Sequence, residues 1–240
     1  MKPKTSVRVE VNMSVPSSKS QIFHAYLLLA VIFGLAAAIA QSGSTASQRK
    51  TSTPYTGDLS IFESPGREQR LHIDRVMDAL AIAPGKSVAD IGAGSGWFTV
   101  RAAKRVTSSG EVYAVDINPD AIAYINRRVA GDGVHNVKTI LSTPKDPELP
   151  ANSIDAVLLL KTYHEVSNPV VLMRNLRSAL RPSARIGIID RSGNGENHGV
   201  QKSVVVREMG EAGYRLVDEQ NNLVKDDDMD YFLIFTEAPH

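Results

Sequence analysis

The chain has 240 residues, of which 42% are hydrophobic and 22% charged, a composition that is ordinary for a globular protein with a sizeable core. It contains no cysteine, which excludes disulfides, thiolate metal sites and a cysteine nucleophile. Residues 1–40 hold four basic residues and one acidic residue, and without them the formal charge is −2, so we expect no nucleic-acid partner.

An uninterrupted apolar run occupies residues 25–40, after a positively charged flank. It is short for a membrane-spanning helix, which needs about 20 residues, but it has the length of a signal-peptide core. Its end, Ala38-Ile39-Ala40, matches an A-x-A cleavage pattern, and a start at Met13 would give a leader of conventional length. Residues 1–40 are therefore predicted to be a signal peptide or membrane anchor that engages the membrane or the export machinery. The protein is expected to be exported, periplasmic or membrane-anchored, or cytoplasmic if this extension has no function.

Residues 41–60 begin with a stretch rich in Ser, Thr and Gln and are predicted to be a flexible linker, with the folded domain over residues 61–240. Apolar side chains at near-helical spacing predict the first helix of this domain over residues 68–80. Pro84 and Gly85 then mark a turn.

A glycine-rich turn follows the first predicted strand, which covers residues 87–91. Gly92, Gly94 and Gly96 leave the backbone open to close approach by a ligand and tolerate positive φ. A helix from about Ser95 to Arg105 would direct its free N–H groups and the positive end of its dipole at that ligand. The pattern suits a nucleotide, or a cofactor that carries a nucleoside, at the carboxyl end of a parallel strand.

The second predicted strand covers residues 111–115 and ends at Asp116, 24 residues after Gly92. A carboxylate at this distance can accept hydrogen bonds from both hydroxyls of a ribose. Asp116 is equally compatible with a structural role at the start of a helix over residues 118–130. Trp97 stands where a dinucleotide-binding turn would have its third glycine, which disfavours a pyrophosphate ligand.

The remaining predicted elements continue the alternation of strands and helices. They are strands over residues 137–141, 156–160, 185–189, 214–219 and 231–236, and helices over residues 169–180 and 200–212. The 156–160 strand is apolar on both faces, as a central parallel strand should be. Repeated alternation, followed by two strands without a helix between them, predicts an α/β fold with a seven-stranded, mostly parallel sheet whose last strand is antiparallel.

The run Asp90-Ile91-Gly92-Ala93-Gly94-Ser95-Gly96 resembles motif I of class I S-adenosylmethionine (SAM)-dependent methyltransferases, and the resemblance extends over residues 68–236. It implies a Rossmann-like three-layer sandwich and SAM as the cofactor. The cofactor-binding residues that it implies are Asp90, Gly92, Ala93, Gly94, Ser95, Gly96, Asp116 and Ile117. This class commonly has an acidic residue after the third strand, near the adenine amine. Here Ser142 and Thr143 occupy that place, so adenine is expected to contact Thr143 or backbone groups.

Candidate catalytic residues follow the fourth strand, where the sequence reads Lys161-Thr162-Tyr163-His164-Glu165. Because the positive sulfur of SAM already activates the methyl carbon, the enzyme needs to align a nucleophile, exclude water and sometimes remove a proton. His164 is the predicted base. Tyr163 is predicted to position the acceptor or to face the sulfonium through its ring. The alternative for His164 is a structural role beneath the sheet edge or at the start of the next helix. The histidines show no metal-binding spacing, and no metal is expected.

The leading hypothesis is a SAM-dependent methyltransferase that acts on a small-molecule acceptor. A second hypothesis is a catalytically silent SAM-binding protein of the cell envelope, suggested by the predicted export signal and the missing acid of the adenine loop. A third, an NAD(P)-dependent oxidoreductase, is disfavoured by Trp97.

Overall fold

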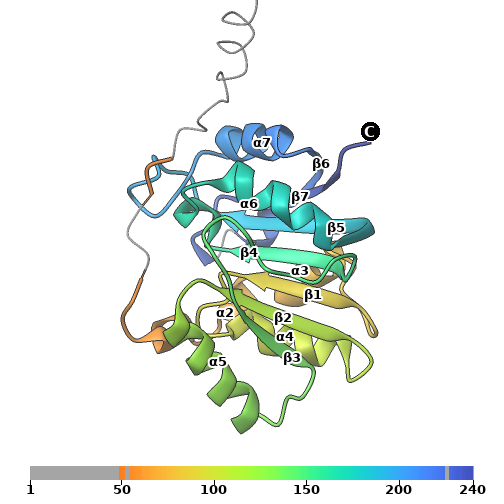
Figure 1. Ribbon diagram of the computed structural model, residues 1–240. Coiled ribbons are helices and arrows are strands. Elements are labelled where there is room, and N and C mark those ends of the chain that lie inside the picture. Colours follow the sequence, from red (N-terminus) through yellow and green to blue (C-terminus); the bar gives the residue numbers. More distant parts are fainter. Residues whose placement is uncertain (1–48, 52–54, 225–226, 240) are drawn as a thin grey trace, which may run out of the picture. The chain divides into compact units, whose positions relative to one another are not determined.

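The structure, a computed structural model, describes residues 49–51, 55–224 and 227–239, which lie within one compact unit (Figure 1). The predicted signal peptide or anchor at residues 1–40 lies outside the described residues. Among the residues that are described, no helix combines the length and the apolar composition that crossing a membrane requires.

A seven-stranded sheet forms the centre of the fold. Its strands are β1 (Ser87–Ile91), β2 (Glu111–Asp116), β3 (Val137–Leu141), β4 (Ile154–Leu160), β5 (Leu180–Asp190), β6 (Tyr214–Glu219) and β7 (Tyr231–Glu237). They are arranged in the order β3-β2-β1-β4-β5-β7-β6. The pairs from β3 to β5 are parallel, whereas β7 runs antiparallel to both β5 and β6. The predicted mostly parallel sheet with an antiparallel last strand is therefore confirmed.

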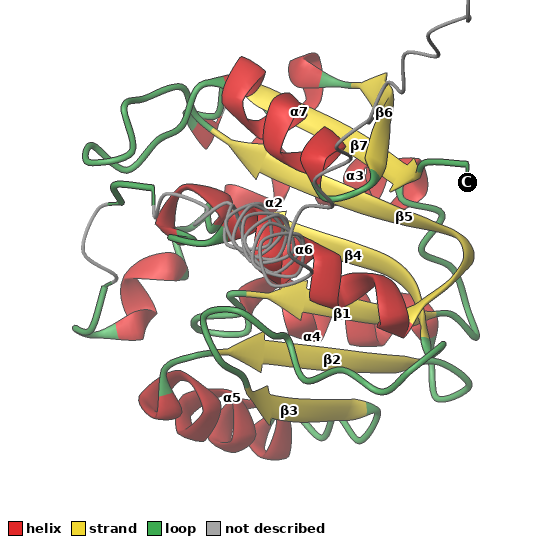
Figure 2. Ribbon diagram, turned by 45° about the horizontal axis from the view of Figure 1, so that its top comes forward, coloured by secondary structure: helices red, strands yellow, loops and turns green. Residues whose placement is uncertain are grey.

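Helices cover both faces of the sheet (Figure 2). They are α2 (Arg67–Arg70), α3 (Ile73–Ala79), α4 (Trp97–Val106), α5 (Pro119–Gly131), α6 (Pro169–Leu176) and α7 (Lys202–Glu211). Successive residues of a strand face opposite sides, so Val88 packs with side chains of α3 and α4, and Ala89 belongs to the core cluster that contains side chains of α6 and α7. The three-layer sandwich follows from this alternation.

The first predicted helix is divided into α2 and α3 at His72, whose φ is 44°. Leu71 and Ile73 flank this break and are both buried. In one continuous helix, residues two positions apart point about 200° away from each other and could not both face the core. The left-handed residue between them turns the chain so that both side chains are buried.

The helix predicted over residues 169–180 is present as α6, which ends at Leu176, and a 3-10 helix (Arg177–Ala179) that continues it up to the start of β5 at Leu180. Pro182 explains why the helical segment stops there, because it cannot continue a helix and it favours extended backbone at the residue before it. The pairing of β5 with β4 shifts register close to this point, between Ile154 and Ala156.

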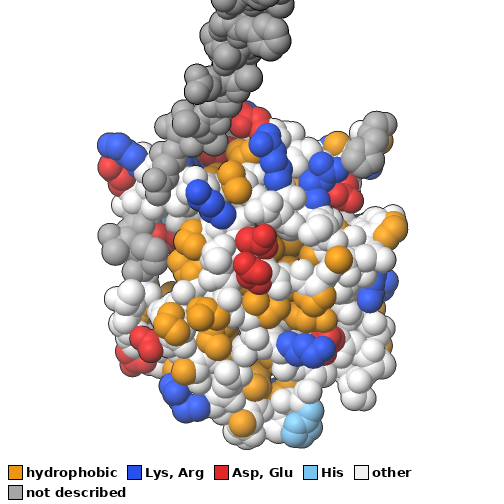
Figure 3. Space-filling model, in the orientation of Figure 1, with side chains coloured by type: hydrophobic (Ala, Val, Ile, Leu, Met, Phe, Trp, Pro, Cys, Tyr) orange, Lys and Arg blue, Asp and Glu red, His pale blue; other side chains and the backbone are white. Residues whose placement is uncertain are grey.

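Basic and acidic side chains are interspersed with hydrophobic ones on the face of the molecule shown in Figure 3. A groove for nucleic acid would instead gather basic side chains on one surface.

Candidate active site

A cavity of about 910 Å³ lies at the carboxyl ends of β1, β2, β4 and β5. Its volume is near the upper end of the range of small-molecule sites, about 300–1,000 Å³, so it has room for a cofactor and a second molecule. One end is lined by the glycine-rich turn after β1 and by the residues after β2, and the other by His164, Glu165 and His198.

The glycine-rich turn forms the floor of the first end. Gly92, Gly94 and Gly96 have φ values of 75°, 55° and 72°, in the region that favours glycine. A Cβ atom at Gly92 would lie 2.2 Å from the side chain of Thr162, so glycine is needed there for space as well as for conformation. The N–H group of Gly92 donates to the carbonyl oxygen of Val115 at 2.8 Å, which ties the turn to the end of β2.

Asp116 closes the same end of the cavity. Its carboxylate accepts hydrogen bonds from the N–H groups of Gly94 and Asn118, both at 2.9 Å. These bonds fix its orientation and leave further lone pairs that can accept from ligand hydroxyls. The N-cap of α5 is Asn118, whose side chain accepts from the N–H of Asp120 at 2.9 Å. Asp116 is therefore not needed as the helix cap.

Asp90 lies deeper, with 2% of its surface exposed. It accepts a hydrogen bond of 2.6 Å from the hydroxyl of Thr99, and burial raises its pKa to about 7 in the ligand-free protein. A cationic ligand beside it would favour the charged carboxylate. The end of the cavity that contains Asp90 is thus suited to a positively charged group.

Trp97 is buried, and two guanidinium groups contact its indole ring. The carbon atoms at the centres of the Arg67 and Arg101 guanidiniums lie 4.5 and 4.0 Å from the ring centroid. The indole lines the cavity without filling it. Arg67, which also lines the cavity, was not predicted as a site residue, because a single arginine in a short helix has no sequence pattern that distinguishes it.

The other predicted cofactor residues line the same cavity, but they differ in exposure. Ala93 and Ser95 are buried in the turn, whereas Ile117 is 47% exposed at its rim. Thr143 lines the cavity, and its hydroxyl accepts a hydrogen bond of 3.0 Å from the N–H of Asp146. The hydroxyl of Thr143 thus stabilises the loop after β3 and remains near enough to contact a ligand.

His164 lies at the opposite end of the cavity, in a 3-10 helix (Tyr163–Glu165) that follows β4. It is 5% exposed, and its Nδ1 atom lies 2.8 and 2.9 Å from the two carboxylate oxygens of Asp190 at the end of β5. Because a carboxylate accepts hydrogen bonds, Nδ1 carries the proton in the neutral ring and Nε2 has a free lone pair. Asp190 was not predicted as a site residue, although its place at the end of the strand beside β4 was a usable signal.

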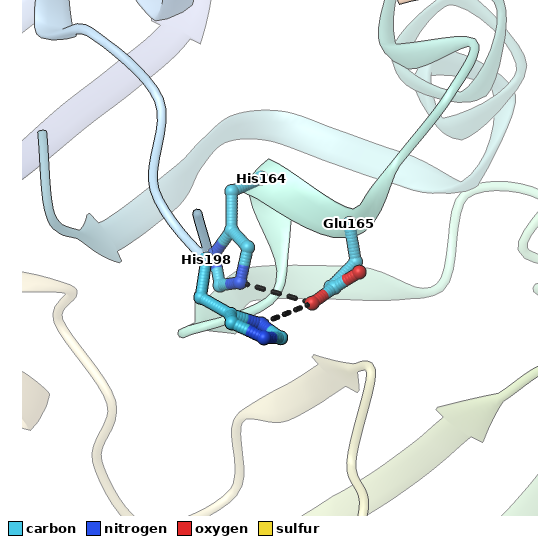
Figure 4. Close-up of side chains that lie close together, drawn as sticks. All are labelled: His164, Glu165 and His198. Atoms are coloured by element: carbon cyan, nitrogen blue, oxygen red, sulfur yellow. Dashed lines mark hydrogen bonds and ion pairs between the residues drawn. The ribbon is translucent and has the colours of Figure 1, made fainter. Parts of the chain in front are cut away.

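Glu165 and His198 complete this end of the cavity (Figure 4). The Oε1 atom of Glu165 lies 3.2 Å from Nε2 of His164 and 3.1 Å from Nδ1 of His198. His198 comes from the loop between β5 and α7, 33 residues after Glu165. Proximity of these side chains depends on the fold, so their sequence spacing did not reveal it.

Tyr163 lies in the core and does not line the cavity, in contrast to the role predicted from the sequence. Its side chain is fully buried in the core cluster that contains side chains of α6 and α7, and Arg49 lies over its ring at 5.1 Å. It is not among the residues that line the cavity. The prediction that Tyr163 positions the acceptor does not fit this location, because in a 3-10 helix neighbouring side chains diverge by about 120° and His164 occupies the cavity side.

Comparisons with known proteins bear on this site. A family model described as a methyltransferase domain matches residues 88–183. A protein-L-isoaspartate O-methyltransferase from Pyrococcus horikoshii is 30% identical over 101 residues, which cover 42% of this chain and 45% of that protein. The ubiquinone/menaquinone biosynthesis C-methyltransferase UbiE from Hydrogenovibrio crunogenus is 23% identical over 68% of this chain and 62% of its own length. The chain thus spans about half the length of these curated relatives.

A crystal structure of a SAM-dependent methyltransferase from Aquifex aeolicus has the same fold, with a TM-score of 0.65 and 24% identity, and the match covers 75% of this chain and 97% of that one. This likeness shows the fold, and together with the family model over residues 88–183 it supports the class I methyltransferase domain that the sequence predicted. The cofactor of such domains is SAM. The comparisons support neither a silent envelope protein nor an NAD(P)-dependent oxidoreductase.

Proposed function

We propose that the protein is a methyltransferase that transfers the methyl group of SAM to a small molecule. The observation that carries this proposal is that one cavity contains both a nucleoside-type cradle and a buried histidine held by a carboxylate. The relatives support transfer from SAM, since those named above are O- and C-methyltransferases by name.

In the proposed complex the cofactor lies across the carboxyl ends of β1 and β2. Asp116 accepts hydrogen bonds from the ribose hydroxyls, and the glycine-rich turn from Gly92 to Gly96 lies against the nucleoside. Asp90 faces the cationic amino group of SAM. Arg67 lines the same cavity and is the proposed partner of the SAM carboxylate, in addition to its present contacts with Asp227 and the carbonyl oxygen of Phe62. Ile117 and Thr143 flank the adenine ring.

The acceptor then occupies the other end of the cavity, next to His164. Asp190 fixes the ring through Nδ1, so Nε2 is the atom available to activate a nucleophile. In this proposal Nε2 removes the acceptor's proton, which is the role predicted for His164 from the sequence. The volume of the cavity suits a small molecule as the acceptor.

The test follows transfer of an isotopically labelled methyl group from SAM into the small-molecule fraction of a cell extract. The expected result is a labelled product with the wild-type chain and at least a hundredfold less with His164→Gln, while the affinity for S-adenosylhomocysteine is unchanged. Equal labelling by the two proteins would contradict the role of His164. Failure of the wild type to transfer label to any extract component would contradict the activity itself.

The prediction that residues 1–40 form a signal peptide or anchor is tested separately. Sequencing of the mature N-terminus should show cleavage after Ala40 if the segment is a cleaved signal, or an intact leader in the membrane fraction if it is an anchor. An intact leader in the cytosolic fraction would contradict both.

A further inference from the structure

We propose that His164, Glu165 and His198 form a binding site for a first-row divalent transition-metal ion such as Zn²⁺. The inference departs from the expectation that no metal is needed, and its catalytic part rests on the proposed function. Two imidazoles and one carboxylate are a donor set that suits zinc and its neighbours, whereas magnesium and calcium prefer oxygen ligands throughout.

The positions of the donor atoms match what such an ion requires. Oε1 of Glu165 lies 3.2 Å from Nε2 of His164 and 3.1 Å from Nδ1 of His198. One donor atom from each of the three residues lies within 4.8 Å of the other two. Metal–ligand bonds of about 2.0–2.2 Å at tetrahedral angles place ligand atoms roughly 3.3–3.6 Å apart. Small movements of the side chains are enough to reach this geometry. The side chain of His198 has room to move because it is 58% exposed.

The hydrogen bond between His164 and Asp190 also favours a cation at this point. Asp190 holds the proton on Nδ1, so the neutral ring directs the lone pair of Nε2 towards the carboxylate of Glu165. Two electron-rich atoms 3.2 Å apart repel each other unless a proton or a metal ion lies between them. Glu165 and Asp190 together supply two negative charges, which balance a dication.

The two histidine ligands are held in place by contacts outside the site. The link from Asp190 to Nδ1 of His164 is the carboxylate–histidine arrangement that commonly orients metal ligands and raises their basicity. The loop that carries His198 is fixed by Arg191, whose Nε donates to the carbonyl oxygen of His198 at 2.8 Å. A β-bridge between Asn194 and Val200 closes the same loop.

The three protein ligands leave coordination positions for another molecule, and all three residues line the cavity. An ion here would bind the acceptor directly, which favours an alcohol or phenol as the acceptor class. Coordination lowers the pKa of the hydroxyl, and its proton passes to solvent. The bound oxygen then attacks the methyl carbon of SAM. An O–C bond forms as the C–S bond breaks, and the electron pair of that bond stays on sulfur, which becomes a neutral thioether.

The experiment titrates Co²⁺ into the full chain, prepared without a histidine tag and treated with a chelator. Calorimetry and visible absorption should show one ion per chain. Affinity should fall at least tenfold in His198→Ala and in Glu165→Gln, while His135→Ala, a change at an exposed histidine outside the site, should bind as the wild type does. S-adenosylhomocysteine affinity should stay the same in all four proteins, which confirms that each is folded.

The proposal is overturned if Co²⁺ does not bind saturably at millimolar concentration, or if His198→Ala and Glu165→Gln bind it as tightly as the wild type. These readouts need no acceptor and no turnover, so their failure is distinct from failure of the proposed methyl transfer. If the ion does not bind but label is still transferred, His164 acts as the base without a metal.

Discussion

The two ends of the cavity are constructed in different ways. The cofactor end is formed largely by consecutive residues after β1 and by Asp116, whose contacts are with backbone N–H groups. The acceptor end is formed by side chains from three separate segments, represented by His164, Asp190 and His198. Backbone cradles of the first kind serve one cofactor, whereas side chains on separate loops can change with the acceptor.

The largest effect is expected at the cofactor end, from Gly92→Ala. The added Cβ would lie 2.2 Å from Thr162, and φ at this position is 75°, so overlap and backbone strain together should lower the free energy of unfolding by about 2–5 kcal/mol. The matched control is Gly131→Ala at the end of α5, where a Cβ meets nothing within 4 Å. It should be neutral or stabilise by up to about 1 kcal/mol. Denaturant unfolding measures both, and similar losses in the two variants would contradict this account of the turn.

Asp116→Asn should weaken SAM binding next most strongly. It replaces a charged acceptor by a neutral one, and hydrogen bonds to charged groups contribute about 1.5–3 kcal/mol, which corresponds to roughly ten- to a hundredfold in affinity. The control is Asp120→Asn, an exposed acid in the first turn of α5. Calorimetry with SAM should show the loss only in the first variant; equal affinities would remove Asp116 from the site.

Asp190→Asn tests the acceptor end alone. The amide can donate to Nδ1 and so stabilise the wrong tautomer of His164, which places the proton on Nε2. Co²⁺ affinity should fall about 10- to 100-fold, as for other losses of a group that orients a metal ligand, with SAM affinity unchanged. A parallel loss of both affinities would show that the two ends are not independent.

The smallest effect is a pH dependence of cofactor binding. Burial raises the pKa of Asp90 to about 7, so SAM affinity should rise between pH 6 and pH 8 as the carboxylate forms, by up to about tenfold per pH unit below 7. The pKa of Asp90 in the folded protein exceeds its usual value of 3.8. The ligand-free folded protein therefore loses stability as pH rises from about 4 through 7, because Asp90 must then lose a proton that the fold favours. Asp90→Asn should make SAM affinity independent of pH in this range, and an unchanged profile would assign the titration to another group.

Most of the fold could be predicted, because strands and helices leave local patterns. The boundaries of β3 and the N-cap of α5 at Asn118 follow from short stretches of sequence. The division of the first helix at His72 could not be predicted, since it depends on which neighbours must be buried together.

The site shows the same division. Gly92 and Asp116 were recognisable because one continuous unit, the turn, α4 and β2, separates them by a fixed length of chain. Asp190 and His198 reach His164 only through the pairing of β4 with β5 and the course of the loop that follows. The burial of Tyr163, adjacent to His164 in sequence, depends on packing against Arg49 and the core, which a local pattern does not encode.

The most direct test of the central claim is a crystal structure of the chain with S-adenosylhomocysteine. The account predicts both ribose hydroxyls within about 2.6–3.2 Å of the carboxylate of Asp116, with the sulfur atom facing the His164 end of the cavity. A nucleoside bound elsewhere, or bound here with its ribose away from Asp116, would contradict it.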